Sequence, residues 1–148
     1  MAAGFREGIV SKELVHLYVK NRMNAIAPNL TIIVGELVGA MMILHAGSLI
    51  NLAKYPSSTV QILGAEKSYI RALSTTRNTP KHGIIYHASL VEQTPDQYKG
   101  KIARMLSAKA SLAVRCDVFS DGVINTEHAM ENVVNIEKEI ENILELYC

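Results

Sequence analysis

The feature that most constrains the fold is an almost wholly apolar segment between Pro28 and Gly47. Its large side chains include Ile32, Ile33, Val34, Leu37, Val38, Met41, Met42, Ile43 and Leu44. A helix without a polar face normally lies at the centre of a core, so the segment predicts one buried helix over about 29–45. It is too short for a membrane span, and Glu36 and His45 interrupt or bound it. Pro28 suits the first helical turn, and Gly47 suits the C-terminal end.

Two glycines, Gly35 and Gly39, lie four positions apart in this segment. Glycine inside a helix costs about 1 kcal/mol relative to alanine. We therefore expect another helix to approach closely at these two positions, because such packing would compensate for that cost.

The other segments are also helical in their periodicity, whereas strand signals are weak. The best strand candidate, 84–86, is too short to build a sheet. We expect further helices over 4–25 and 87–92, and a long one from Thr94 to about Phe119. At its start, Thr94 and Gln97 form a capping-box pattern with Pro95 at the first helical position. The predicted fold class is therefore all-α.

A last helix from about Thr126 carries apolar residues at steps of three and four, which form a heptad-like seam. The seam consists of Val133, Ile136, Ile140, Ile143 and Tyr147. We expect this amphipathic helix to dock on its own domain; the alternative is a coiled coil with a partner. The expected organisation is an N-terminal helix over 1–26, a compact multi-helix core over 27–121 and an acidic C-terminal amphipathic helix over 122–148.

Charge is distributed unevenly, although the formal net charge is only +1. From Asn51 to Arg115 there are ten basic and three acidic residues, a balance of +7. From Cys116 to Cys148 there are eight acids and one base, Lys138, a balance of −7. A basic middle with an acidic tail favours contact between a polyanion and the middle of the chain.

Within the basic part, the stretch 54–73 places Gly64 before a short helical pattern that we expect to begin at Ala65. Lys67 falls in its first turn and Arg71 lies four residues later on the same face. Cations near a helix N-terminus oppose the helix dipole and repel one another. They suit a phosphate-binding site, although the stretch alone slightly favours the simpler explanation that both side chains extend into water.

No catalytic or metal-binding motif stands in the sequence. It has no nucleophile elbow, HExxH, P-loop or glycine-rich dinucleotide loop. Cys116 falls among apolar residues on a helix face, a poor setting for a nucleophile, and Glu36 is a single carboxylate without an evident partner. Cys116 and Cys148 form no metal-ligand pattern. We therefore expect neither an enzyme nor a cofactor.

Five longer motifs carry a family resemblance. They are APNLT (27–31), VGELVGA (34–40), HAGSLINLAKYPSSTVQILGAEK (45–67), NTPKHGIIYHASLV (78–91) and KGKIARMLSAK (99–109). Together they resemble the Nop domain, the shared domain of the core proteins of box C/D small nucleolar ribonucleoproteins. The similarity covers about 21–121, and the tail from Asp121 departs from it. The GAEK and HASLV forms favour the nucleolar branch over the spliceosomal one.

The resemblance implies a compact all-α scaffold that recognises a kink-turn box C/D guide RNA together with its bound kink-turn protein. Such a scaffold supports guide-directed 2′-O-methylation of ribosomal RNA and pre-rRNA processing in the nucleolus. In the family a separate fibrillarin-type methyltransferase is held by an N-terminal domain, and a long coiled coil pairs two scaffolds. Neither part stands in this sequence, so we expect a fragment or a reduced variant that does not recruit the methyltransferase alone.

The resemblance also implies RNA-binding residues. The first set, which would contact the RNA backbone, is Gly64, Ala65, Glu66, Lys67 and Arg71. His87 would stack on or bond to a flipped-out base. A second set of cations would add phosphate contacts and comprises Lys54, Arg77, Lys81, Lys99, Lys101 and Arg104. Asn51 and Gln61 are either base-reading residues or local caps.

Two alternatives remain open. One is the spliceosomal relative of the tri-snRNP, which would differ in the kink-turn RNA that it binds. The other is a pure protein-interaction module that uses the acidic tail helix.

Overall fold

The computed structural model describes residues 2–75, 83–120 and 125–147, and all of its regular elements are helical. The expected all-α fold is thus confirmed. The elements are α1 (Ala2–Ile26), α2 (Pro28–Val34), α3 (Glu36–Ala46), α4 (Leu49–Lys54), α5 (Ser57–Ile62), α6 (Glu66–Ser74), the 3₁₀ turn η1 (Ile84–His87), α7 (Ser89–Glu92), the 3₁₀ turn η2 (Asp96–Tyr98), α8 (Lys99–Phe119) and α9 (Glu127–Tyr147).

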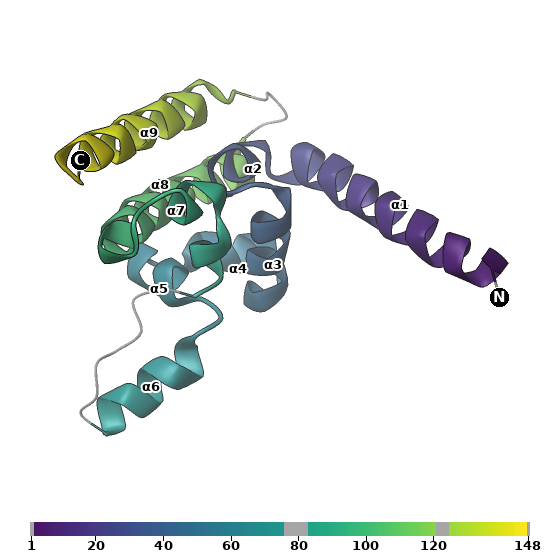
Figure 1. Ribbon diagram of the computed structural model, residues 1–148, viewed down its shortest axis with the longest axis horizontal. Coiled ribbons are helices and arrows are strands. Elements are labelled where there is room, and N and C mark those ends of the chain that lie inside the picture. The colour runs from purple at the N-terminus through teal and green to yellow at the C-terminus, as the bar shows by residue number, and fades with distance from the viewer. Residues whose placement is uncertain (1, 76–82, 121–124, 148) are drawn as a thin grey trace.

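The helix α8 is the centre of the molecule, and α2, α4, α5 and α9 pack against it (Figure 1). Ile102, Leu106, Ala110 and Val114 follow one another at intervals of four and are all buried. Small residues, among them Ser107, lie beside this row and let the neighbouring helices approach. Burying each large aliphatic side chain contributes about 1.5–3 kcal/mol, so this row on α8 anchors the core.

The prediction of a single central helix over 29–45 is wrong, because the helix is interrupted at Gly35. Gly35 has φ +90° and ψ 161°. This backbone conformation is not helical, and residues other than glycine rarely adopt it. It separates α2 from α3, whose axes are bent by 116°. The outer side of α3 is consequently exposed at Leu37, Met41 and Leu44 rather than buried.

Gly39 confirms the expected close approach, whereas Gly35 does not. A Cβ on Gly39 would lie 2.8 Å from Cε of Met23 on α1, so the glycine admits the base of that helix. A Cβ on Gly35 would meet no atom within 4 Å. The two glycines therefore have different tasks: Gly35 turns the chain and Gly39 lets α1 pack.

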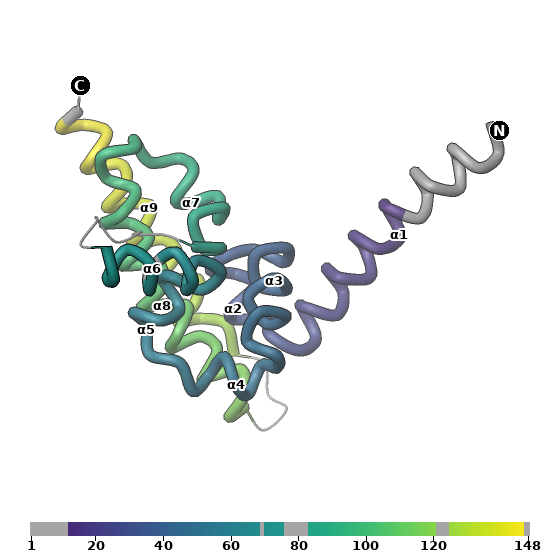
Figure 2. The backbone as a smooth tube through the Cα atoms, turned by 90° about the horizontal axis from the view of Figure 1, so that it is seen from below, coloured from purple at the N-terminus to yellow at the C-terminus, as the bar shows by residue number. Residues whose placement is uncertain are grey.

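In the part of α1 that Figure 2 draws in colour, the helix leads away from the body toward the N-terminus. It begins and ends close to the expected bounds, and Pro28 opens the next helix as predicted. Near its end Met23 is buried, but Leu14, Leu17 and Tyr18 are more than half exposed. Among the side chains of α1 that the structure describes, from Lys12 onward, those at the C-terminal end belong to the core.

The start of α2 is held by a buried carboxylate from the end of α8. Oδ1 of Asp117 accepts hydrogen bonds from the backbone N–H of Asn29 (3.1 Å) and from its side-chain amide (2.8 Å). Oδ2 accepts from the N–H of Leu30 at 3.0 Å. The first N–H groups of a helix have no partner within the helix, so Asp117 caps α2 from 87–88 residues away in the chain.

The start of the long helix differs from the predicted capping box. The chain enters α8 through η2, and no side chain caps either start. Thr94 is buried, and its hydroxyl donates to the carbonyl of Leu90 at 2.9 Å. Thr94 therefore closes the preceding α7, and Pro95 precedes η2 instead of opening a helix. The strand candidate at 84–86 belongs to the 3₁₀ turn η1.

The C-terminal helix α9 docks on α2 and α8, as expected. Ile136, Ile140 and Ile143 of the predicted seam are buried in this contact. Glu139 also forms an ion pair with Lys101 of α8. The apolar seam is thus occupied by the domain itself.

Among the described residues, no single helix is long and apolar enough to cross a bilayer; only the bent pair α2–α3 reaches that length and composition.

Candidate nucleic-acid interface

The helix α6 projects from the body of the domain (Figure 1). The chain that leaves the body before α6 and the chain that returns after it are joined by backbone hydrogen bonds. The N–H of Gly83 donates to the carbonyl of Gln61 at 3.0 Å, and the N–H of Ile84 donates to Leu63 at 2.8 Å. These bonds join the outgoing end of α5 to the returning chain at η1. They fix the base from which α6 projects.

Two glycines permit this close crossing. A Cβ on Gly83 would lie 2.0 Å from the carbonyl oxygen of Leu63, which no neighbouring backbone could accommodate. A Cβ on Gly64 would lie 2.7 Å from Cγ1 of Ile84, and Gly64 has φ +93°. Gly64 therefore lets the returning chain of the domain itself pass close by, whereas the family resemblance implied that it contacts RNA.

The GAEK turn, Gly64 to Lys67, directly follows α5 and Leu63. The N–H of Ala65 donates to the carbonyl of Ile62 at 2.8 Å, and the N–H of Gly64 donates to Oε2 of Glu66 at 3.0 Å. The helix begins at Glu66, one residue later than expected, with Ala65 at the capping position. An acid in the first turn is favourable to the helix dipole.

Lys67 and Arg71 are both exposed. In the described ranges neither takes part in an ion pair, so the fold does not use their charges. Lys67 lies in the first turn as predicted, but Arg71 lies in the last turn of this short helix, where a cation is favoured. The idea that both cations oppose the dipole is therefore wrong for Arg71, because α6 ends at Ser74.

Two apolar side chains on α6 are also exposed, Ile70 at 63% and Leu73 at 57%. They lie three residues apart and so share a face, which adjoins the face of Lys67 and Arg71. Sequence reasoning missed this pair, although its spacing next to the two cations was visible. The projecting helix thus offers a cationic face beside an apolar one.

His87 is exposed at the end of η1, three residues after Ile84. Since Ile84 is bonded to Leu63, His87 and the GAEK turn are held by the same crossing of the chain. The crossing therefore holds His87 and the start of the predicted set, Gly64 to Glu66, at the base of one projection, whereas Arg71 lies in the last turn of α6.

Several cations of the second set have partners within the fold. Nζ of Lys99 lies 3.3 Å from Oδ1 of Asp96 and 5.5 Å from the centroid of the Tyr86 ring. Lys101 pairs with Glu139 on α9. Arg115, another cation of α8, donates from Nε to the carbonyl of Ala53 at 3.2 Å and so ties α8 to α4.

The remaining members of the set are simpler to place. Lys54 and Arg104 are exposed, while Arg77 and Lys81 fall outside the described residues. The side-chain amide of Asn51 donates to the carbonyl of Ala46 at 3.2 Å, a local bond at the end of α3.

Glu36 differs from its predicted setting, whereas Cys116 does not. Glu36 opens α3, where an acid suits the helix dipole without a side-chain partner. Cys116 is exposed, and it borders a surface hollow together with Leu112 and Ala113, so its predicted apolar neighbours are present. No group of three or more metal-ligating side chains occurs within the described part of the chain.

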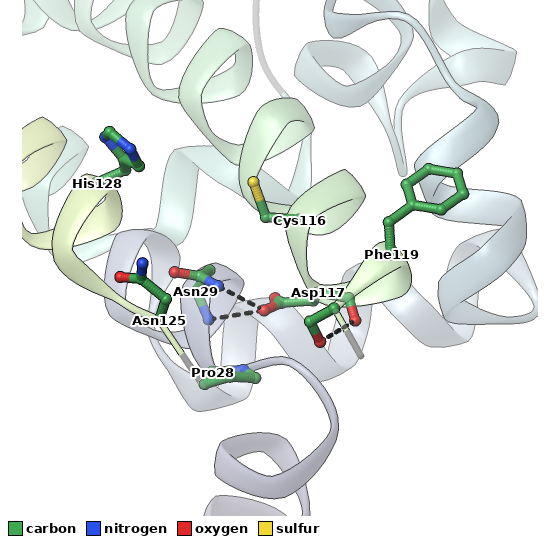
Figure 3. A pocket seen from close by; sticks show the side chains of 8 residues that line it. Pro28, Asn29, Cys116, Asp117, Phe119, Asn125 and His128 are labelled. Atoms are coloured by element: carbon green, nitrogen blue, oxygen red, sulfur yellow. Dashed lines mark hydrogen bonds between the residues drawn. The ribbon is translucent and has the colours of Figure 1, made fainter. Parts of the chain in front are cut away.

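A separate hollow lies where the start of α2 and the end of α8 meet the start of α9 (Figure 3). Its volume is about 250 Å³, and Cys116, Phe119 and His128 border it beside the Asn29–Asp117 contact. Among the described residues that border it, no charged groups converge, since the carboxylate of Asp117 is turned to Asn29 and Leu30.

Comparison with known proteins agrees with this architecture. The family model described as Nop, "snoRNA binding domain, fibrillarin", matches residues 6–142. The match extends beyond Asp121 into α9, so the expected departure of the tail from the family is wrong. The reason is physical: α9 packs on α2 and α8 as part of the domain.

Curated relatives are similar over most of this chain. Nucleolar protein 58 of Schizosaccharomyces pombe is 57% identical over 127 residues, which cover 85% of this chain and 25% of that protein. Nucleolar protein 58 of Homo sapiens is 56% identical over 126 residues, which cover 85% and 24%. The chain therefore spans about a quarter of the length of these relatives.

A solved structure has the same fold. A chain in the crystal structure of a fibrillarin/Nop5p complex matches with a TM-score of 0.74 and 31% identity, covering 94% of this chain and 52% of that one. The arrangement of helices, the GAEK turn and the extent of the family match lead to one conclusion: this chain belongs to the Nop family.

Proposed function

We propose that this chain is a non-catalytic, RNA- and protein-binding domain of a box C/D small nucleolar ribonucleoprotein scaffold. Its ligand is a kink-turn guide RNA together with the kink-turn protein already bound to it. The observation that carries the proposal is the projection of α6, whose cations and apolar side chains are exposed and unused by the fold.

The two faces of α6 suit a ligand made of RNA and protein. Lys67 and Arg71 would contact phosphates, which position an RNA without reading its sequence. Ile70 and Leu73 would contact the apolar surface of the bound protein, because exposed apolar side chains mark interaction sites when they adjoin one another. His87, at the base of the same projection, would stack on an unpaired base.

The nucleolar branch is favoured over the spliceosomal one. The similar curated proteins are named nucleolar protein 58, and the matching crystal structure contains fibrillarin. We infer a nucleolar location and a role in guide-directed rRNA 2′-O-methylation and pre-rRNA processing. Methyl transfer would belong to a separate fibrillarin-type subunit.

The rival function, a protein-interaction module built on α9, is less well supported. Its apolar seam at Ile136, Ile140 and Ile143 is buried against α2 and α8, and Glu139 is paired with Lys101. Little apolar surface of the seam is left for a partner.

The test is a titration of the purified chain into three ligands: a box C/D kink-turn RNA, its kink-turn protein and the preassembled complex of the two. We expect binding to the complex to be much tighter than to either component, and to weaken as salt rises because phosphates are contacted. Equal binding to the complex and to bare RNA would overturn the composite recognition. Equal binding to the complex and to the protein alone would favour the interaction module.

The paired variant Lys67→Ala/Arg71→Ala locates the site. It should reduce the slope of log K against log salt by about 1–2, since each lost phosphate contact removes about one unit. Lys20→Ala/Arg22→Ala is the matched control, because it removes the same charges from exposed positions on α1. Circular dichroism should show intact helices in both. Identical slopes in the two variants would place the RNA elsewhere.

A further inference from the structure

Glu66, the acid of the GAEK turn, is an unusual residue for a surface that binds RNA. A carboxylate near phosphates is repelled, yet Glu66 directly precedes Lys67 in the cationic projection. In the structure its Oε2 accepts a hydrogen bond from the N–H of Gly64 at 3.0 Å, and the residue is half-buried. The carboxylate is therefore turned back toward its own backbone.

We propose that Glu66 is a positioning residue that sets the direction in which α6 leaves the body and so places Lys67 against the RNA. This inference rests on the proposed function, whose ligand is the kink-turn RNA with its bound protein. Glu66 itself would make no favourable contact with that RNA.

The geometry of the turn supports this role. Leu63 has ψ 127°, which turns the N–H of Gly64 away from the carbonyls of α5, and the carboxylate of Glu66 satisfies this N–H. The next N–H, that of Ala65, is bonded back to Ile62. Together the two bonds define the path of the chain between the fixed base at Leu63 and the first residue of α6.

A change at position 66 would affect the position of Lys67, because the two residues are adjacent at the start of α6. Glu66 is the first residue of α6 and Lys67 the second, so any change in the start of the helix moves the lysine directly. In addition, an acid in the first turn stabilises the helix through its dipole. Loss of the Gly64 bond would let α6 rotate about its base, and Lys67 would then spend less time at its phosphate.

Three substitutions separate positioning from direct contact. Glu66→Ala removes the acceptor, whereas Glu66→Gln keeps an oxygen that can accept from Gly64 and removes only the charge. Glu66→Ala combined with Lys67→Ala asks whether the acid acts through the lysine. Glu92→Ala is the control, because Glu92 is an exposed acid of the same basic region at the end of α7.

The first measurement is made on the free full chain, by NMR hydrogen exchange at the amide of Gly64. Exchange should be faster in Glu66→Ala by about threefold to tenfold, the change that corresponds to one net hydrogen bond. It should stay near the wild-type rate in Glu92→Ala. An unchanged rate at Gly64 in Glu66→Ala would overturn the proposal without any ligand.

The second measurement is the affinity for the preassembled kink-turn RNA–protein complex across a salt series. Glu66→Ala should bind about threefold to tenfold more weakly, with a salt slope lower by about one because the contact of Lys67 is lost. Glu66→Gln should remain within about twofold of wild type. Glu66→Ala should add little to Lys67→Ala, since groups that act together are not additive.

Contrary outcomes are clear. If Glu66→Gln is as weak as Glu66→Ala, the charge contacts the partner directly and positioning is wrong. If the two single losses add, Glu66 does not act through Lys67. If the wild-type chain does not bind the complex at all, the proposed function fails, while the exchange rate at Gly64 still decides whether Glu66 holds the turn.

Discussion

Asp117 offers the sharpest test of how the core is held together. It is 8% exposed, and its carboxylate accepts three hydrogen bonds from Asn29 and Leu30. Asp117→Ala would leave all three donors without a partner at the start of α2. If each loses about 1 kcal/mol, the typical net value of a hydrogen bond, unfolding becomes easier by about 3 kcal/mol. Asp117→Asn keeps one acceptor oxygen and should cost about half as much.

Thermal unfolding followed by circular dichroism measures this change. For a chain of this size each kcal/mol shifts Tm by about 2–4 °C, so Asp117→Ala should lower Tm by about 6–12 °C. Asp96→Ala is the control, because the side chain of Asp96 is 97% exposed and its ion pair with Lys99 is worth little. If Asp117→Ala and Asp96→Ala unfold within about 2 °C of each other, the cap does not stabilise the fold as argued.

Two further substitutions test the crossing below α6 and the contact of α9. Gly83→Ala should destabilise the chain by about 1–3 kcal/mol, as overpacking does, because its Cβ would meet the carbonyl of Leu63; a urea midpoint equal to that of wild type would contradict the tight crossing. Lys101→Ala should cost about 1 kcal/mol or less in the same assay, since its ion pair with Glu139 is partly exposed to water. A loss above about 2 kcal/mol would mean that this pair, rather than the buried isoleucines, holds α9.

The sequence predicted those parts of the fold that depend on local periodicity. The spacing of Ile136, Ile140 and Ile143 correctly indicated a docked amphipathic helix, and Pro28 correctly marked the boundary between two helices. Periodicity reports which residues share a face, and a face that is apolar at helical spacing has to be covered. Such information is present in the order of residues alone.

What the sequence could not provide is the path of the backbone between helices. Gly35 and Gly39 look alike in the sequence, yet only the tertiary structure decides that the first ends a helix and the second admits Met23. Because the sequence did not reveal the interruption at Gly35, its apolar run predicted one wholly buried helix.

Cations posed the same difficulty at the candidate site. Lys67 and Lys101 are equally basic in the sequence, but Glu139 lies 38 residues from Lys101 and reaches it only because α9 folds back. Intramolecular pairing of this kind cannot be inferred from a count of charges. The ion pairs in the structure distinguish the cations that stabilise the fold from those that remain available to a ligand.

The crossing at the base of α6 bears on how such a domain diversifies. It is tied by main-chain atoms of Gln61, Leu63, Gly83 and Ile84, so it tolerates many side chains in the helix that it supports. Substitutions on the outer surface of α6 could accumulate over generations while the scaffold beneath stayed intact. Partner choice can thereby drift independently of foldability.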